Sequence, residues 1–219
     1  MSNARVTEMA MKLANSGGLL DYGPELSRLL LEVLRSLANG RPVTGEQVDQ
    51  IVAGIAIARD EADQFLRQIS ERDADDSIVG FMGLSLNDHP HRFNVNGTRM
   101  STWCAEDTLF LPAMLKQTAT IVSQSPLTKE KIRLTVSADG VEESSPAGAV
   151  VSIVVINPDK VDMSSAQAIW GTFCNHIFFV ASREEGEQWA AGRDDIEILS
   201  LDEGFELGKQ FWSRVLAYA

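Results

Sequence analysis

Apolar residues recur every three or four positions from residue 24 to Ile69, the spacing of helices that each bury one face. Residues 24–37 predict a first helix, and Asn39-Gly40 favours its end. Thr44-Gly45-Glu46-Gln47 is a capping-box sequence, which predicts the start of a second helix. A third helix is predicted to begin at Asp60, with its apolar residues on one side.

The pattern then changes to short apolar runs typical of strands. Residues 78–84 and 92–95 predict two strands, joined by a polar turn around residues 87–90. Three helices followed by a strand pair make a winged-helix-like arrangement, which we assign to a domain of residues 1–90. A winged helix suggests DNA binding, but the third helix carries Asp60, Glu61 and Asp63, which repel phosphate. We expect this domain to shield a site elsewhere in the chain and not to bind DNA.

The second half predicts strands with flanking helices. Residues 149–156 are a continuous β-branched run, which is typical of a central strand. Ser182 and Ser200 each begin a predicted helix. Residues 158–165 are predicted to form a loop. The remaining predicted strands cover residues 119–123, 132–136, 171–180 and 196–199. We therefore expect an α+β protein in which residues 91–219 form a second domain around a mixed sheet.

Composition narrows the possible partners. The 219 residues carry a formal net charge of −12, which disfavours nucleic acid and anionic membrane surfaces as partners. No apolar run approaches the roughly 18–20 residues of a membrane span, and the first residues lack a signal-peptide pattern. We expect a cytoplasmic protein whose two cysteines are reduced.

The first cysteine lies in a segment with its own carboxylate. If residues 104–111 are helical, Cys104 and Asp107 share one face, about 5–6 Å apart at Cβ. Ser101 or Thr102 is expected to cap the helix, and Pro112 to kink or stop it. A helix start favours a thiolate, whereas the second negative charge of Asp107 opposes it. Because the helix start favours loss of the thiol proton and the Asp107 charge disfavours it, we expect the thiol and the carboxyl to share a proton.

The second cysteine lies in the predicted strand 171–180. A strand thiol facing Cys104 and Asp107 would complete a soft site with two sulfurs and a proton donor. Taken singly, Cys104 and Cys174 are each better explained as inert core residues, and Asp107 as a first-turn acid. Zinc is disfavoured, because the sequence has no Cys-x-x-Cys and its histidines do not fall at ligand spacing with the cysteines.

Three neighbours of the cysteines carry their own expectations. Trp103 and Phe173 flank the two cysteines, so they either line an apolar pocket or belong to the core. Glu106 is expected to face away from Asp107, into solvent. His176 lies two residues from Cys174, and core packing or a hydrogen bond to a sheet edge is its expected role.

These segments together resemble the alkylmercury lyase (organomercurial lyase) family, and the resemblance covers most of the chain in order. Asn175 stands where some relatives carry a further cysteine, which removes a possible accessory mercury ligand. The segments that carry the resemblance are Gly40-Arg41-Pro42-Val43, Trp103-Cys104-Ala105 with Asp107-Thr108-Leu109 and Pro112-Ala113, Leu134-Thr135-Val136-Ser137, Pro146-Ala147-Gly148, Phe173-Cys174 with His176, and Gly204-Phe205 with Leu207-Gly208.

The resemblance implies that residues 91–219 are a catalytic domain that cleaves carbon–mercury bonds with Cys104, Cys174 and Asp107. It implies no resident cofactor, because mercury is substrate and product. It further implies that cellular thiols release the metal and that a mercuric reductase accepts it.

The chemistry fits these residue types. Thiolate and mercury(II) are both soft, so two sulfurs select this metal and push electron density toward the carbon. A carboxylic acid beside the metal can then protonate the carbon. Two alternatives remain open: a winged-helix regulator whose thiols sense metal or oxidant, and a passive mercury-binding module.

Overall fold

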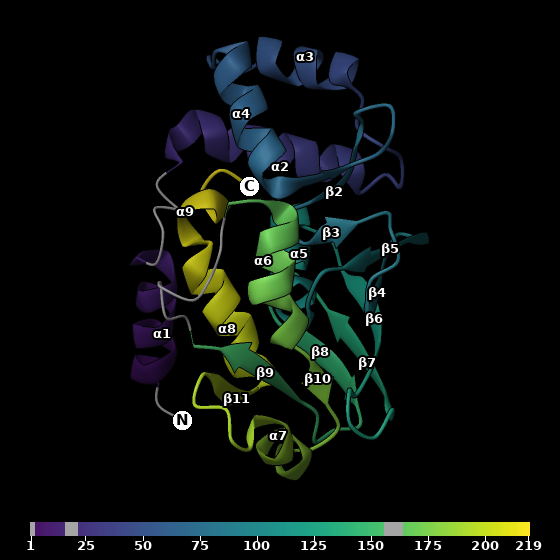
Figure 1. The fold of residues 1–219 in the computed structure, drawn as a ribbon, viewed down its shortest axis with the longest axis vertical. Helices are drawn as coiled ribbons and strands as arrows, with labels where there is room; N and C mark the ends of the chain where they lie inside the picture. Colours follow the sequence, from purple (N-terminus) through teal and green to yellow (C-terminus); the bar gives the residue numbers. More distant parts are fainter. Residues whose placement is uncertain (1–2, 16–21, 156–163) are drawn as a thin grey trace.

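The computed structural model describes residues 3–15, 22–155 and 164–219. Figure 1 shows helices α2, α3 and α4 gathered at one end, a large sheet along one side, and a small sheet with α7 at the other end. The combination of helices and sheets confirms the predicted α+β class. The predicted mixed sheet is wrong, because the described strands of both sheets pair antiparallel with their neighbours. Of the loop predicted at residues 158–165, residues 158–163 lie outside the described residues.

The three predicted N-terminal helices are present. Thr44 caps α3 through a capping box, in which its side chain accepts the N–H of Gln47 and its own N–H donates to the Gln47 side chain. A further helix, α1, precedes them and lies along α8 (Figure 1). The bounds are α1 Asn3–Asn15, α2 Gly23–Leu37, α3 Gly45–Ala53 and α4 Arg59–Ile69.

Eight of the described strands form one antiparallel sheet in the order β1-β2-β3-β5-β4-β6-β7-β8. Its strands are β1 Ser70–Arg72, β2 Ile78–Phe81, β3 Leu84–Ser85, β4 His91–Val95, β5 Thr98–Thr102, β6 Ala119–Gln124, β7 Lys131–Val136 and β8 Val141–Ser145. β1–β3 come from residues 1–90 and the others from residues 91–219, so both predicted domains supply the same sheet. The winged-helix form of residues 1–90 and the boundary after residue 90 stay predictions.

The predicted pairing of residues 78–84 with 92–95 is wrong. β4 pairs with β5, and β5 separates β4 from β3. The tight turn between β4 and β5 consists of Asn96 (φ +50°) and Gly97 (φ +83°). Asn-Gly favours two-residue hairpin turns with positive φ at both positions, so the nearest hairpin forms here and not at the polar segment 87–90.

The second sheet has the order β10-β9-β11, with β9 (Val150–Val154) between β10 (Phe179–Val180) and β11 (Ile196–Ser200). The central strand predicted at residues 149–156 is therefore confirmed over Val150–Val154, and residue 156 lies outside the described residues. The strand predicted at 171–180 is wrong in most of its length, because α6 (Ala166–Thr172) and a 3₁₀ turn, η1 (Cys174–His176), precede the short β10. The Ser165 side chain accepts the N–H of Ala168 and so starts α6, a signal that outweighs the local strand preference.

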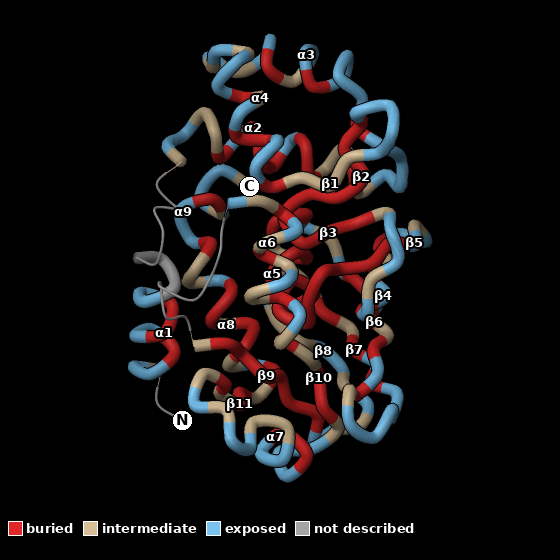
Figure 2. Tube along the Cα trace, viewed as in Figure 1, coloured by how far each residue is buried: buried red, intermediate tan, exposed pale blue. Residues whose placement is uncertain are grey.

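Helix α5 (Ala105–Leu115) occupies the centre of the molecule. All its residues except Ala113 are buried, because β4 to β7 cover one side and α8 (Leu201–Phe211) the other. Figure 2 shows buried residues concentrated in the middle of the molecule, in β9 and along much of α8. Pro112 lies inside α5, which continues to Leu115, so the predicted stop did not occur. Tight packing around Leu111 and Met114 compensates for the missing backbone donor.

Three helices near the end of the chain complete the described fold. α7 (Arg183–Ala190) begins where predicted, with the Ser182 side chain accepting the N–H of Glu185. α8 begins with a capping box of Ser200 and Glu203, as predicted, and α9 (Ser213–Leu216) follows it. Within the described ranges, no helix combines the length and the hydropathy needed to cross a bilayer.

Candidate active site

Cys104 is itself the N-cap of α5. Its backbone N–H donates to Asp107 Oδ2 at 2.8 Å, and its side chain accepts the N–H of Asp107, so the two residues form a capping box. The cap predicted at Ser101 or Thr102 is wrong, because both residues belong to β5. Pairing with β3 and β4 holds them extended, and the helix begins only after the chain leaves the sheet.

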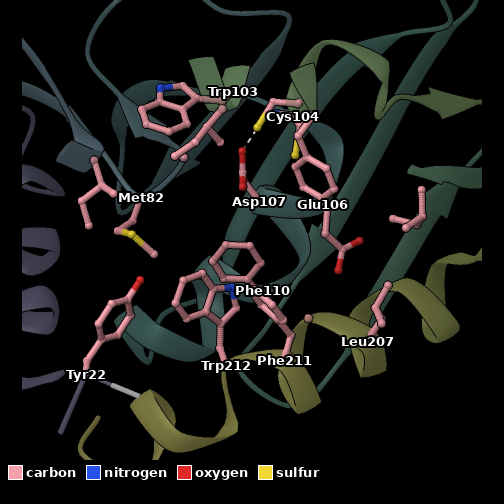
Figure 3. Close-up of a pocket in the computed structure, with 17 residues that line it drawn as sticks. Tyr22, Met82, Trp103, Cys104, Glu106, Asp107, Phe110, Leu207, Phe211 and Trp212 are labelled. Carbon is pink, nitrogen blue, oxygen red and sulfur yellow. Dashed lines mark hydrogen bonds between the residues drawn. The ribbon is translucent and has the colours of Figure 1, made fainter. Parts of the chain in front are cut away.

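Cys174 reaches Cys104 from the other side of the fold. The 3₁₀ turn η1 presents it, and the backbone N–H of Ala105 donates to the carbonyl of Ile177 at 3.2 Å, which ties this turn to the start of α5. The ligand atoms of Cys104, Asp107 and Cys174 all lie within 4.8 Å of one another. Figure 3 shows the Asp107 carboxyl pointing toward Cys104. Among the described residues, no other group of three potential metal ligands is this compact, and no histidine joins it.

The three side chains are removed from water. Cys104, Asp107 and Cys174 expose 1%, 8% and 4% of their surface. Burial raises the pKa of Asp107 to about 7, even though the Cys104 N–H and thiol hydrogen-bond to the carboxylate. Burial, the hydrogen bond to Cys174 and the Asp107 charge raise the pKa of Cys104 well above its ordinary value. The helix start therefore does not yield a thiolate here, and the protons stay within the cluster.

The pKa of Cys174 is likewise set by effects that act in opposite directions. Its hydrogen bond with Cys104 lowers the pKa, but burial and the charge of Asp107 act in the other direction and prevail, so the pKa is raised. Both sulfurs thus hold protons at neutral pH until a soft metal displaces them.

Gly83 makes room for the Asp107 carboxyl, and the sequence reading missed it. It has φ +87° in the turn between β2 and β3, and its carbonyl accepts the N–H of Trp103 at 2.9 Å. A Cβ at this position would lie 2.3–2.7 Å from the carboxyl atoms of Asp107. The available signal was a glycine inside the apolar run 78–84, which often marks a close approach of other atoms to the backbone.

An apolar cavity of about 110 Å³ adjoins the cluster. Trp103 and Phe173 line it and also pack in or against the core, so the two alternatives left open for them both apply. Tyr22 and Ile69 bring the N-terminal helices into the same wall. The other aromatic lining residues are Phe110, Phe211 and Trp212 (Figure 3). The cavity is thus closed by segments from both ends of the chain.

Glu106 also lines this cavity, so the expected solvent-facing position is wrong. It exposes only 8% of its surface, because α5 is covered on all sides and offers no solvent face. Burial raises the pKa of Glu106 well above its ordinary value, the charge of Asp107 adds to the rise, and the nearby Gly208 backbone offsets only part of it. His176 is partly exposed, and its backbone carbonyl accepts the Ser152 hydroxyl of β9. The role expected for its side chain stays a prediction.

Fold and site together define a class: an α+β protein with a buried cluster of two thiols and one carboxyl, a donor set that suits a soft metal. The family model "Alkylmercury lyase" matches residues 84–213. The chain is 34% identical to an alkylmercury lyase of Streptomyces lividans, over 98% of this chain and 95% of that protein. It is 35% identical to an alkylmercury lyase of Staphylococcus epidermidis, over 89% and 87%.

A solved structure of the mercury-bound form of MerB2 has the same fold, with a TM-score of 0.72 and 23% identity over 97% of this chain and 100% of that one. The chain belongs to the alkylmercury lyase family and is an enzyme of this kind.

Gly83→Ala is expected to lower turnover of an organomercury substrate at least tenfold, because the added methyl displaces the Asp107 carboxyl. Gly97→Ala is the matched control: Gly97 has a similar φ of +83°, but a Cβ there meets nothing within 4 Å. Both variants carry comparable backbone strain of about 1 kcal/mol. Steady-state assays of the two variants separate the effect of backbone strain from that of displacing the Asp107 carboxyl. Equal activities of the two variants would contradict the role assigned to Gly83.

Asp107→Asn is expected to stabilise the substrate-free protein, and more so at higher pH. Burial raises the pKa of Asp107 from 3.8 to about 7, so the folded protein binds more protons than the unfolded chain between these values. Wild-type stability therefore falls as the pH rises through this window, and asparagine avoids the loss. The gap in unfolding free energy between variant and wild type should widen by about 3 kcal/mol from pH 5 to pH 8. Denaturant titrations at both pH values measure it, and a constant gap would refute the shift.

Proposed function

We propose that this enzyme cleaves the carbon–mercury bond of organomercury compounds by protonolysis, with Cys104 and Cys174 binding mercury and Asp107 delivering the proton. The observation that carries the proposal is the compact cluster: both sulfurs and a carboxylate oxygen lie within 4.8 Å of one another, beside an apolar cavity. Mercury bound to the sulfurs would place its organic group in that cavity.

The proposed reaction balances as follows. An organomercury cation meets two thiols, and each thiol gives up its proton as its sulfur bonds to mercury. One proton passes through Asp107 to the carbon as the carbon–mercury bond breaks, and the other leaves to solvent. The products are a hydrocarbon and a mercury(II) ion held by two thiolates. The second thiolate matters because its electron density makes the carbon more carbanion-like and so easier to protonate.

Asp107 suits the role of proton carrier. A pKa of about 7 keeps a proton available near neutral pH, yet lets the carboxylate take a proton from a thiol. The hydrogen bond from the Cys104 N–H and the glycine at position 83 fix the carboxyl before substrate arrives. The surrounding apolar wall excludes water, which strengthens these charges and hydrogen bonds.

The remaining parts of the proposal concern the surroundings of the reaction. We expect no resident cofactor, because mercury enters as substrate and stays as product. Cellular thiols would exchange with the product and carry mercury(II) to an acceptor such as a mercuric reductase. The helices of residues 1–90 would shield the site, since Tyr22 and Ile69 already form part of its wall.

Replacing either cysteine by serine is expected to reduce benzene release from phenylmercury at least 100-fold while the protein stays folded. A hydroxyl is harder and far less acidic than a thiol, so it does not replace the soft ligand. Gas chromatography measures the benzene, and circular dichroism checks the fold. Near-normal activity of either variant would refute the two-sulfur mechanism. A wild type that binds phenylmercury without releasing benzene would favour a passive mercury-binding module or a sensor.

Asp107→Asn is expected to bind phenylmercury normally but to slow its cleavage by roughly 10²–10⁴-fold, because the amide has no proton to give. Single-turnover kinetics separate binding from cleavage. Asp202→Asn, an exposed acid in the first turn of α8, serves as the matched control. In heavy water the wild type is expected to release benzene with one deuterium. Unchanged single-turnover cleavage by Asp107→Asn would assign the proton to another group.

A further inference from the structure

The Glu106 carboxyl takes no part in the reaction proposed above. It is the second residue of α5, between the cluster residues Cys104 and Asp107 in sequence, and it lines the same cavity. Neither of its oxygens has a hydrogen bond of ordinary geometry with a described residue, and the Gly208 backbone is the polar group that acts on it from α8. In Figure 3 its carboxyl points away from that of Asp107, toward Leu207 of α8. A second acid is therefore present in the cavity without a partner.

Helix α8 is shaped to accommodate this side chain. A Cβ at Gly208 would lie 2.9 Å from Glu106 Oε1 and 2.9 Å from the Cβ of Phe110, one turn further along α5. A Cβ at Gly204 would lie 3.4 Å from Glu106 Oε2. Two glycines four residues apart thus leave space where the faces of α5 and α8 meet. The carboxyl has a defined place inside the protein and does not reach solvent.

A buried polar group without a hydrogen bond is costly, so its position calls for a partner. An apolar residue would fill the same space at lower free energy. A carboxyl group offers an acceptor oxygen whether or not it carries a proton. Its natural partner is a small polar group, in particular one that donates a hydrogen bond.

We propose that Glu106 determines specificity by accepting a hydrogen bond from a polar group, an amine or a hydroxyl, on the organic part of the substrate. The inference rests on the proposed function, because mercury held by Cys104 and Cys174 directs the organic group into the cavity that Glu106 lines. The rest of that wall is largely aromatic and aliphatic, but the Tyr22 hydroxyl and the Trp103 indole N–H also lie in it without a hydrogen-bond partner. The indole N–H only donates, and Tyr22 belongs to the N-terminal part of the wall, so Glu106 is the acceptor beside the cluster residues of α5.

Phenylmercury and aminophenylmercury make a matched pair of probes. A ring fits a cavity of about 110 Å³, which is of the order of cavities known to admit benzene. Phenylmercury leaves Glu106 without a hydrogen-bond donor. An amine at the third or fourth carbon of the ring donates an N–H, and the two isomers place that N–H at different distances from mercury. The ratio of kcat/KM for each aminophenyl isomer to that for phenylmercury is the measured quantity, because effects common to both substrates cancel.

In the wild type this ratio is expected to exceed that of Glu106→Met roughly tenfold for at least one isomer, because methionine leaves the buried amine without an acceptor. Glu106→Gln is the matched control: its amide oxygen still accepts the N–H, so the ratio is expected to stay close to that of the wild type. Electronic effects of the amine on the chemical step are the same in all three proteins. Ratios that agree across the three proteins for both isomers would overturn the proposal.

Infrared difference spectra provide a test that is independent of turnover. In Asp107→Asn, the carboxyl stretching band of Glu106 is identified by its loss in the double variant that also carries Glu106→Gln. Binding of an aminophenylmercury isomer is expected to shift the frequency of this band, and binding of phenylmercury is not. A band that neither isomer shifts would overturn the proposal. Benzene release by the wild type reports separately on the proposed function, so the two failures are distinguishable.

Discussion

Removal of the first turn of α5 from water is the constraint on which the rest of the site depends. In solvent, Asp107 would be a carboxylate with its proton lost, and Cys104 an ordinary thiol. Burial against the large sheet and α8 raises both pKa values and retains protons where the proposed reaction would need one. The burial of α5 on nearly all its faces, with Glu106, Asp107 and Thr108 included, would thus serve the proposed chemistry as well as packing.

The burial of that turn depends on residues that are distant from it in the sequence. The absence of a Cβ at Gly83 leaves space for the Asp107 carboxyl. The absence of a Cβ at Gly204 and Gly208 leaves space for Glu106 and Phe110. The Ala105–Ile177 hydrogen bond fixes the second thiol relative to the first. Tyr22 closes the cavity from the start of α2. Gly83, Gly204, Gly208 and Tyr22 shape the site through the space that they leave or occupy, and Ala105 and Ile177 through their hydrogen bond.

Several of these features could be predicted from local sequence. The capping boxes at Thr44 and Ser200 are short-range signals, and the β-branched run around Val151 predicts a central strand from its own composition. The proximity of Cys104 and Asp107 follows from helical spacing. Cys174 joins them only through tertiary structure, and the family resemblance, not its local pattern, pointed there.

The wrong predictions have physical causes that local patterns omit. The segment around Phe173 has strand composition, yet the cap at Ser165 starts a helix and the aromatic side chains are used as cavity wall. Glu106 was placed in solvent because an acid usually is, but a helix enclosed on all sides has no exposed position for it. The large sheet pairs β4 with β5 because the Asn96-Gly97 turn is closer in sequence than the expected partner.

The capping box between Cys104 and Asp107 links the reaction geometry to the integrity of the helix terminus. The carboxyl that would carry the proton is also the group that satisfies the first free N–H of α5, at 2.8 Å. Its orientation is thus set when the helix forms, and its rotational entropy is lost during folding and not during each turnover. In the folded protein the Asp107 carboxyl is therefore already oriented. Fraying of the N-terminus of α5 would remove both the helix cap and the carboxyl orientation that the proposed reaction requires.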